Sequence, residues 1–158
     1  MIRIKAAMKL AAELHEAAEN LPKSTVNRWS RKGIVSKLAD YQMENDTGGR
    51  SGLYPDRLPI EIALTAHLKQ AYKLSQIKQA RELFINKLNA GLNIDAAIEE
   101  LENDKAKAIN KLKNKDPNAL NKFFDYQEEK AEIENIELAI MYAKMYNYLN
   151  KKLKGGEE

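Results

Sequence analysis

The sequence contains no cysteine, which excludes disulfide bonds, thiolate metal sites and cysteine nucleophiles. It also lacks any apolar run close to the roughly 18 residues that span a bilayer. Charged residues interrupt the apolar positions of residues 1–21, so the pattern predicts no secretory signal. We therefore expect a cytoplasmic protein that has no membrane partner.

Motifs for phosphate, metal or catalytic chemistry are also lacking. The pair Gly48-Gly49 is not followed by the Lys-Ser ending of a Walker loop. The two histidines, His15 and His67, have no partner four residues away, as a helical metal site would have. Acidic residues in 99–104 and 128–134 occur together with Lys105, Lys107 and Lys130, at the spacings of ordinary solvated helix faces. We expect no metal, no cofactor and no catalytic residue, and the chain is not predicted to be an enzyme.

The residues that are present suit one domain, or a small domain with an appendage. Of 158 residues, 44% are hydrophobic and 31% are charged, enough for a core and a solvated surface. The formal net charge of +3 is unevenly distributed. Residues 1–75 hold twelve Lys and Arg against eight Asp and Glu, whereas residues 76–158 hold fourteen against fifteen. We divide the chain into an N-terminal domain, residues 1–75, and a helical dimerisation or interaction region, residues 76–158.

Apolar residues recur at helical spacing through most of the chain, which predicts a mostly α fold. The expected helices cover about residues 4–20, 24–32, 59–90, 93–115 and 117–153. Ser24 or Thr25 is expected to cap the second helix. Gly33 stands where a left-handed residue ends that helix, and Asn93 or Asp95 is expected to cap the fourth. The long C-terminal helices are expected to form a coiled coil or a helical bundle.

The strongest turn signal is the run Asn45-Asp46-Thr47-Gly48-Gly49. It separates the weakly alternating residues 38–44 from residues 51–54, and the two flanking segments are predicted to pair as a hairpin. Pro55 ends the second strand. The expected order over residues 4–74 is therefore helix, turn, helix, hairpin and helix.

Residues 23–37 are basic and contain no acid. The basic residues are Lys23, Arg28, Arg31, Lys32 and Lys37. On the predicted helix, Val26 and Trp29 face inward together with the following Ile34, and Trp29 is expected to be a core residue. The outer face then carries Asn27, Arg28, Arg31 and Lys32. Asn pairs bidentately with adenine and Arg with guanine in the major groove of DNA.

Other residues around this helix suit the DNA backbone. Lys23 and Ser24 lie at the helix N-terminus, where backbone N–H groups attract phosphate. Lys37 and Arg50 are expected to contact phosphates, the latter from a glycine-rich hairpin tip that can approach the backbone closely. Tyr54 is expected to pack against the domain with its hydroxyl directed to a phosphate.

The stretch S-T-V-N-R-W-S-R-K-G-I-V at residues 24–35, followed by L-Y-P-D at residues 53–56, resembles the MerR-type winged helix family. The resemblance covers about residues 8–72. It implies a winged helix-turn-helix with a two-stranded wing and binding to duplex DNA. Gly52 departs from the family pattern, which often has an arginine there; in this chain Arg50 lies two positions earlier.

The sequence thus predicts a sequence-specific, duplex DNA-binding homodimer, with transcription regulation as the first hypothesis. One alternative is a structural DNA-binding protein of a phage or plasmid, of the small terminase, excisionase or partition type. Another is a scaffold whose C-terminal helices bind a protein partner. The dimer would use residues 59–90 or 117–153, where Ile133, Ile136 and Ile140 have the spacing of a helix-pairing seam. In the competing interpretation, the C-terminal helices fold onto one another as a monomeric bundle.

Overall fold

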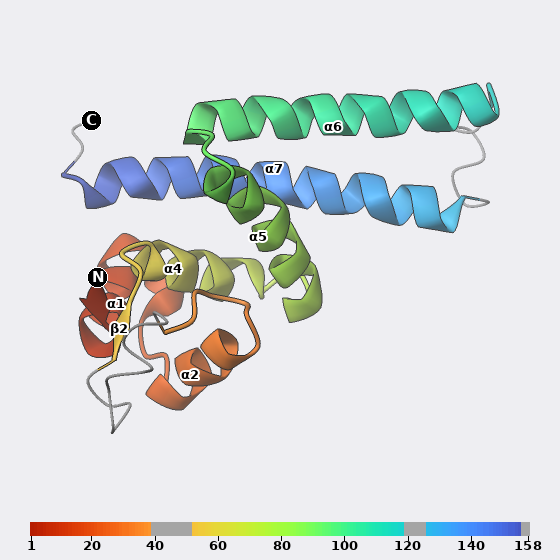
Figure 1. Ribbon diagram of the computed structural model, residues 1–158. Helices are drawn as coiled ribbons and strands as arrows, with labels where there is room; N and C mark the ends of the chain where they lie inside the picture. The colour runs from red at the N-terminus through yellow and green to blue at the C-terminus, as the bar shows by residue number, and fades with distance from the viewer. Residues whose placement is uncertain (39–51, 119–125, 156–158) are drawn as a thin grey trace. The chain divides into compact units, whose positions relative to one another are not determined.

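The computed structural model describes residues 1–38, 52–118 and 126–155, which are mostly helical (Figure 1). The chain divides into two compact units. The first unit is Met1–Lys78 with Tyr148–Glu158, and the second unit is Gln79–Asn147. The chain enters the second unit within helix α5 (Leu74–Asn89) and returns to the first within helix α7 (Gln127–Leu153).

The first unit contains a small sheet and several short helices (Figure 1). Its elements before α5 are β1 (Ile2–Arg3), α1 (Ile4–Leu14), the 3-10 helix η1 (Glu16–Ala18), α2 (Lys23–Arg31), β2 (Leu53–Tyr54) and α4 (Leu58–Leu68). Helices α1, η1 and α4 pack against one another and make the core of this unit.

Helix α4 is the central element of the first unit. Ten of its eleven residues are buried. Its sequence is apolar on every side, which is typical of a helix enclosed by the rest of a fold. Each fully buried Ile or Leu in it contributes about 1.5–3 kcal/mol of hydrophobic stabilisation. Pro59 lies in the first turn, where its missing N–H removes no helical hydrogen bond.

The first helix is shorter than predicted. It ends at Leu14 and not near Asn20, because His15 adopts extended backbone with φ −156° and ψ 134°. The His15 Nδ1 atom accepts a 2.9 Å hydrogen bond from the Ala17 N–H and caps η1. Ala18 remains buried. The apolar pattern therefore continues through a break that periodicity alone does not reveal.

In the sheet of the first unit, strand β2 pairs with a strand that the sequence did not indicate. Strand β2 pairs antiparallel with β1, with Ile2 opposite Tyr54 and Arg3 opposite Leu53. The predicted hairpin placed residues 38–44 beside residues 51–54. Most of that first segment, the turn at 45–49 and Arg50 lie outside the described residues.

The single long helix predicted over residues 59–90 is wrong. Helix α4 ends at Leu68 and α5 begins at Leu74. Between them, the Gln76 Oε1 atom accepts a 2.9 Å hydrogen bond from the Lys73 N–H and caps the start of α5. No proline or glycine marks this break, and the apolar residues on either side keep helical spacing. The predicted close of the helix is confirmed, because α5 ends at Asn89 and Gly91 has a φ of +103°.

In the second unit, helix α6 (Ile94–Lys115) runs antiparallel to α7 (Figure 1). Asn93 caps α6 by accepting a 2.8 Å hydrogen bond from the Ala96 N–H, as the sequence predicts. Salt bridges join the two helices in antiparallel register: Lys144 with Glu102 at 3.4 Å, Lys105 with Glu137 at 3.0 Å, and Lys115 with Glu129 at 3.2 Å.

The last helix differs from its prediction at its start. Asp116 ends α6 and accepts hydrogen bonds from the Asn118 N–H at 2.9 Å and from the Tyr126 hydroxyl at 2.8 Å. Pro117 and Asn118 lie in a turn, so Pro117 does not begin a helix. The described part of α7 begins at Gln127, and its end at Leu153 is confirmed.

The core of the second unit is aromatic and aliphatic. The ring centroid of Phe84 lies 5.1 Å from that of Tyr146 and 6.2 Å from that of Tyr142. Ile133 packs with Leu112 of α6. Two residues of the isoleucine seam predicted to join two chains, Ile133 and Ile136, are only 5% and 7% exposed and pack within one chain, whereas Ile140 is partly exposed.

Candidate nucleic-acid interface

Helix α2 separates its buried and exposed residues cleanly. It begins at Lys23, earlier than the predicted caps, with Pro22 as the N-cap residue. Val26, Trp29 and Ser30 are its buried residues. Trp29 is 1% exposed, which confirms its prediction as a core residue. The indole of Trp29 is therefore unable to stack on a nucleic-acid base.

The site residues predicted from sequence are placed as follows. The exposed ones are Lys23, Ser24, Arg28, Arg31, Lys32 and Lys37. Asn27 and Tyr54 are partly buried. Arg50 lies outside the described residues. All but the last therefore belong to α2, the segment after it, or strand β2, and they share one compact unit.

Tyr54 is tied to the C-terminal part of α2. Burial raises the pKa of its phenol above the ordinary value of 10.0, opposed by a hydrogen bond with the Ser30 side chain and by the charge of Arg31. Tyr54 is therefore partly buried against its domain, as predicted, but its hydroxyl, which was expected to be directed to a phosphate, has a partner inside the protein. Tyr54 thus connects β2 to α2.

A buried polar network, which the sequence did not predict, fixes the segment that follows α2. The Ser30 hydroxyl donates a 2.9 Å hydrogen bond to the Ser36 carbonyl, and the Ser36 N–H donates a 2.7 Å hydrogen bond to Glu61 Oε1. Arg57 Nε lies 3.5 Å from Glu61 Oε2 and donates to the Ser36 hydroxyl at 3.2 Å. A charged residue within an otherwise apolar helix, Glu61, was the available signal. The network holds the end of α2 to the core helix α4.

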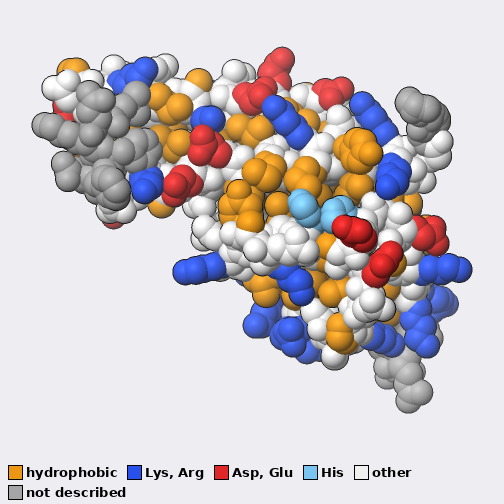
Figure 2. Space-filling model, turned by 180° about the vertical axis from the view of Figure 1, so that it is seen from behind, with side chains coloured by type: hydrophobic (Ala, Val, Ile, Leu, Met, Phe, Trp, Pro, Cys, Tyr) orange, Lys and Arg blue, Asp and Glu red, His pale blue; other side chains and the backbone are white. Residues whose placement is uncertain are grey.

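Two further lysines lie at α2 without having been predicted. The Lys69 ammonium lies 5.5 Å from the Trp29 ring centroid, a cation–π geometry. The Lys78 side chain reaches Gly33, directly after α2. In Figure 2, Lys and Arg side chains line the lower edge of the first unit. The basic surface thus gains residues from outside the stretch 23–37.

The two histidines lie together in the first unit, although 51 residues separate them in the sequence (Figure 2). The ring centroids of His15 and His67 are 4.6 Å apart. The sequence did not indicate this proximity, which arises because α1 and α4 pack side by side. Among the described residues, no group of three or more His, Cys, Asp or Glu side chains is placed to hold a metal ion.

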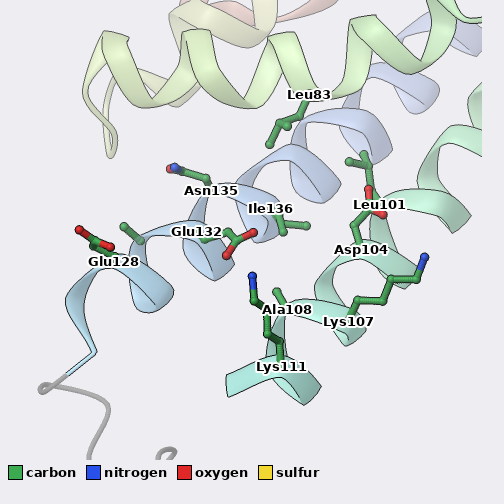
Figure 3. A pocket seen from close by; sticks show the side chains of 11 residues that line it. Leu83, Leu101, Asp104, Lys107, Ala108, Lys111, Glu128, Glu132, Asn135 and Ile136 are labelled. Atoms are coloured by element: carbon green, nitrogen blue, oxygen red, sulfur yellow. The ribbon is translucent and has the colours of Figure 1, made fainter. Parts of the chain in front are cut away.

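The second unit has a groove of about 700 Å³ between side chains of α5, α6 and α7 (Figure 3). Its apolar lining consists of Leu83, Leu101, Ala108, Ala131 and Ile136. One edge, on α6, carries Lys107 and Lys111 together with Asp104, whose charge is paired with Lys87, and the other, on α7, carries Glu128 and Glu132. The groove therefore combines an apolar floor with edges of opposite charge.

Comparison of the chain with protein families, curated proteins and solved structures finds no match. Within the described ranges, no helix has both the length and the apolar character needed to cross a bilayer.

Proposed function

We propose that the chain is a sequence-specific duplex DNA-binding protein that inserts α2 into the major groove. The observation that carries the proposal is the outer face of α2, where Arg28, Arg31 and Lys32 are all exposed. No acidic residue occurs between Lys23 and Lys37 to neutralise them. A cationic helix face of this kind attracts phosphate, because each neutralised phosphate releases condensed counterions.

The chemistry of this face suits base reading as well as backbone binding. Arg28 and Arg31 carry guanidinium groups that can pair with guanine, and Asn27 carries an amide that can pair with adenine. The nine residues of α2 rise about 13 Å, comparable with a major groove about 12 Å wide. The core contacts of Val26 and Trp29 on the opposite face hold the helix in a fixed orientation.

The proposal is tested by binding to duplexes selected from a random library, measured by fluorescence anisotropy. Arg28→Ala is expected to cost about 1–3 kcal/mol and to relax specificity at one position. Lys113→Ala is the matched control, since Lys113 is an exposed basic residue on α6. Absence of duplex binding, or equal losses in the two variants, would contradict the proposal.

We further propose transcription regulation as the role, with residues 8–72 forming a winged helix-turn-helix. The support is the resemblance of the sequence over those residues and the order α1, α2, β2 and α4. A genome-wide DNA pull-down with sequencing distinguishes this role from packaging or partition. For a regulator, the pull-down is expected to enrich a few sites near promoters. For a structural DNA-binding protein, it is expected to enrich one long cluster of sites or a broad region.

The proposed active form is a homodimer, because one helix of nine residues offers few base contacts and symmetric pairing doubles them. We assign the contact to the groove of the second unit. A two-fold axis parallel to α6 and α7 sets α6 of one copy over α7 of the other. The Lys107 and Lys111 edge then meets the Glu128 and Glu132 edge of the second copy. Within the described residues, none of these four side chains forms a salt bridge.

Light scattering at micromolar concentration measures the assembly. The double variant Lys107→Glu, Lys111→Glu is expected to give a monomer, because like charges then face each other across the contact. Adding Glu128→Lys and Glu132→Lys restores opposite charges and is expected to restore the dimer. A wild-type monomer that still binds DNA would refute the dimer and leave the DNA-binding proposal intact.

A further inference from the structure

Two lysines from different elements converge on one glycine at the end of α2. A Cβ atom built on Gly33 would lie 3.5 Å from Lys78 Cε, 4.0 Å from Lys78 Nζ and 3.9 Å from Lys37 Cε. Lys37 follows α2, and Lys78 lies in the second turn of α5. The two lysine side chains therefore meet over a backbone position that carries no side chain of its own.

Among the residues that the structure describes, this pair of positive charges has no acidic partner, since neither Lys37 nor Lys78 forms a salt bridge there. The adjacent Lys32 is also exposed and basic. The C-terminal end of a helix carries partial negative charge, which attracts lysines but repels a single phosphate. An anion that binds there therefore needs more than one cation.

We infer that Lys37, Gly33 and Lys78 form a second phosphate site, which binds a phosphodiester group of the DNA backbone. The inference rests on the proposed function and extends the interface from α2 to α5. Gly33 has a φ of +77° and no Cβ, so the ends of the two lysine side chains can lie close together over the turn. Its N–H donates to the Ser30 carbonyl at 3.0 Å, so the two ammonium groups supply the contacts.

The position of the site gives α2 a backbone anchor at each end. Lys23 and Ser24 lie at its N-terminus, where the helix dipole favours phosphate. The Lys37 and Lys78 pair lies at its C-terminus. Arg28 and Arg31 lie between the two anchors. Backbone contacts on both sides of a base-reading helix fix its register in the groove, because phosphate contacts position the protein and base contacts specify the sequence.

The test is the salt dependence of duplex binding. Lys78→Gln and Lys37→Gln are each expected to weaken binding to all sequences alike and to lower the slope of log affinity against log salt by about 0.9. Lys113→Gln on α6 is the matched control and leaves the slope unchanged. An unchanged slope in both site variants, with Arg28→Ala still damaging, refutes the phosphate site alone. No binding by the wild type refutes the proposed function.

A second measurement needs no DNA. Titration of the ¹⁵N-labelled full chain with inorganic phosphate at constant ionic strength is expected to shift the Gly33 amide resonance. The shift is expected to vanish in the double variant Lys37→Gln, Lys78→Gln, whose remaining spectrum shows that the fold is retained. A Gly33 resonance that ignores phosphate, or that responds equally in the double variant, overturns the inference.

Discussion

Glu61, in the core helix α4, accepts a 2.7 Å hydrogen bond from the backbone N–H of Ser36, in the segment that follows α2. Both residues are buried, with Glu61 at 0% and Ser36 at 3% exposure. A buried carboxylate is costly unless it is paired and hydrogen-bonded. This one therefore links the stability of the first unit to the placement of its basic helix.

Glu61→Ala is expected to lower the free energy of unfolding of the first unit by about 1–3 kcal/mol, because it leaves the Ser36 N–H buried without its acceptor. Glu61→Gln keeps an acceptor oxygen and is expected to lose less. Urea denaturation followed by Trp29 fluorescence reports on this unit, since Trp29 is the only tryptophan. An unchanged free energy of unfolding in Glu61→Ala would contradict the importance of the network.

Tyr54 predicts a stability change at high pH. Its pKa is raised above 10.0 in the folded chain, mainly by burial. The contribution of Tyr54 to stability is therefore fully present below pH 10. It is lost as the pH rises above 10, because the phenol ionises more readily in the unfolded chain than in the folded chain. Between pH 8 and 11, urea denaturation is expected to show a smaller decrease in the free energy of unfolding for Tyr54→Phe than for the wild type. Identical pH profiles would rule out this assignment.

Lys87 joins α5 to α6 through two acids, Glu100 at 2.7 Å and Asp104 at 2.9 Å. Burial alone would lower the pKa of Lys87, but the two carboxylates outweigh it and raise the pKa above 10.5. Lys87→Met keeps the aliphatic stem and removes the charge. The substitution is expected to lower the free energy of unfolding by up to about 1 kcal/mol, and by less at high salt. Lys113→Met is the control, and a loss that ignores salt would argue against an ionic origin.

Gly91 follows α5 with a φ of +103°, and a Cβ there would meet nothing within 4 Å. Gly91→Ala therefore tests backbone conformation without steric crowding. It is expected to cost about 1–2 kcal/mol, because L-residues avoid this region. Asn89→Ala, on the exposed last residue of the helix, is the control. Thermal unfolding followed by circular dichroism measures both, and equal midpoints would refute the prediction.

The sequence predicts those parts of the fold that local chemistry determines. The inward position of Trp29, the left-handed Gly33 and the Asn93 cap all follow from residues close in the chain, and the structure confirms them. The mostly helical composition follows from apolar spacing. Such features need no knowledge of which segments meet in three dimensions.

Features that depend on distant contacts were missed or placed wrongly. The β1 strand has two residues, too few to give an alternating pattern, and its partner lies 50 residues away. The break between α4 and α5 depends on a side-chain cap by Gln76 in a stretch whose apolar spacing continues. Lys78 approaches Gly33 only because α5 returns to the end of α2. For the candidate site, the sequence thus predicted the basic helix but missed Glu61 and Lys78, which are distant in the chain.

The first unit is made of two separated stretches of chain, and this has a consequence for its synthesis. Lys152, near the end of α7, donates a 3.2 Å hydrogen bond to the carbonyl of Leu14 at the end of α1, across 138 positions. At about 5–20 residues per second, translation needs roughly 7–28 s to supply that donor after Leu14. The second unit, whose residues are continuous, is complete in the nascent chain before the first unit can close.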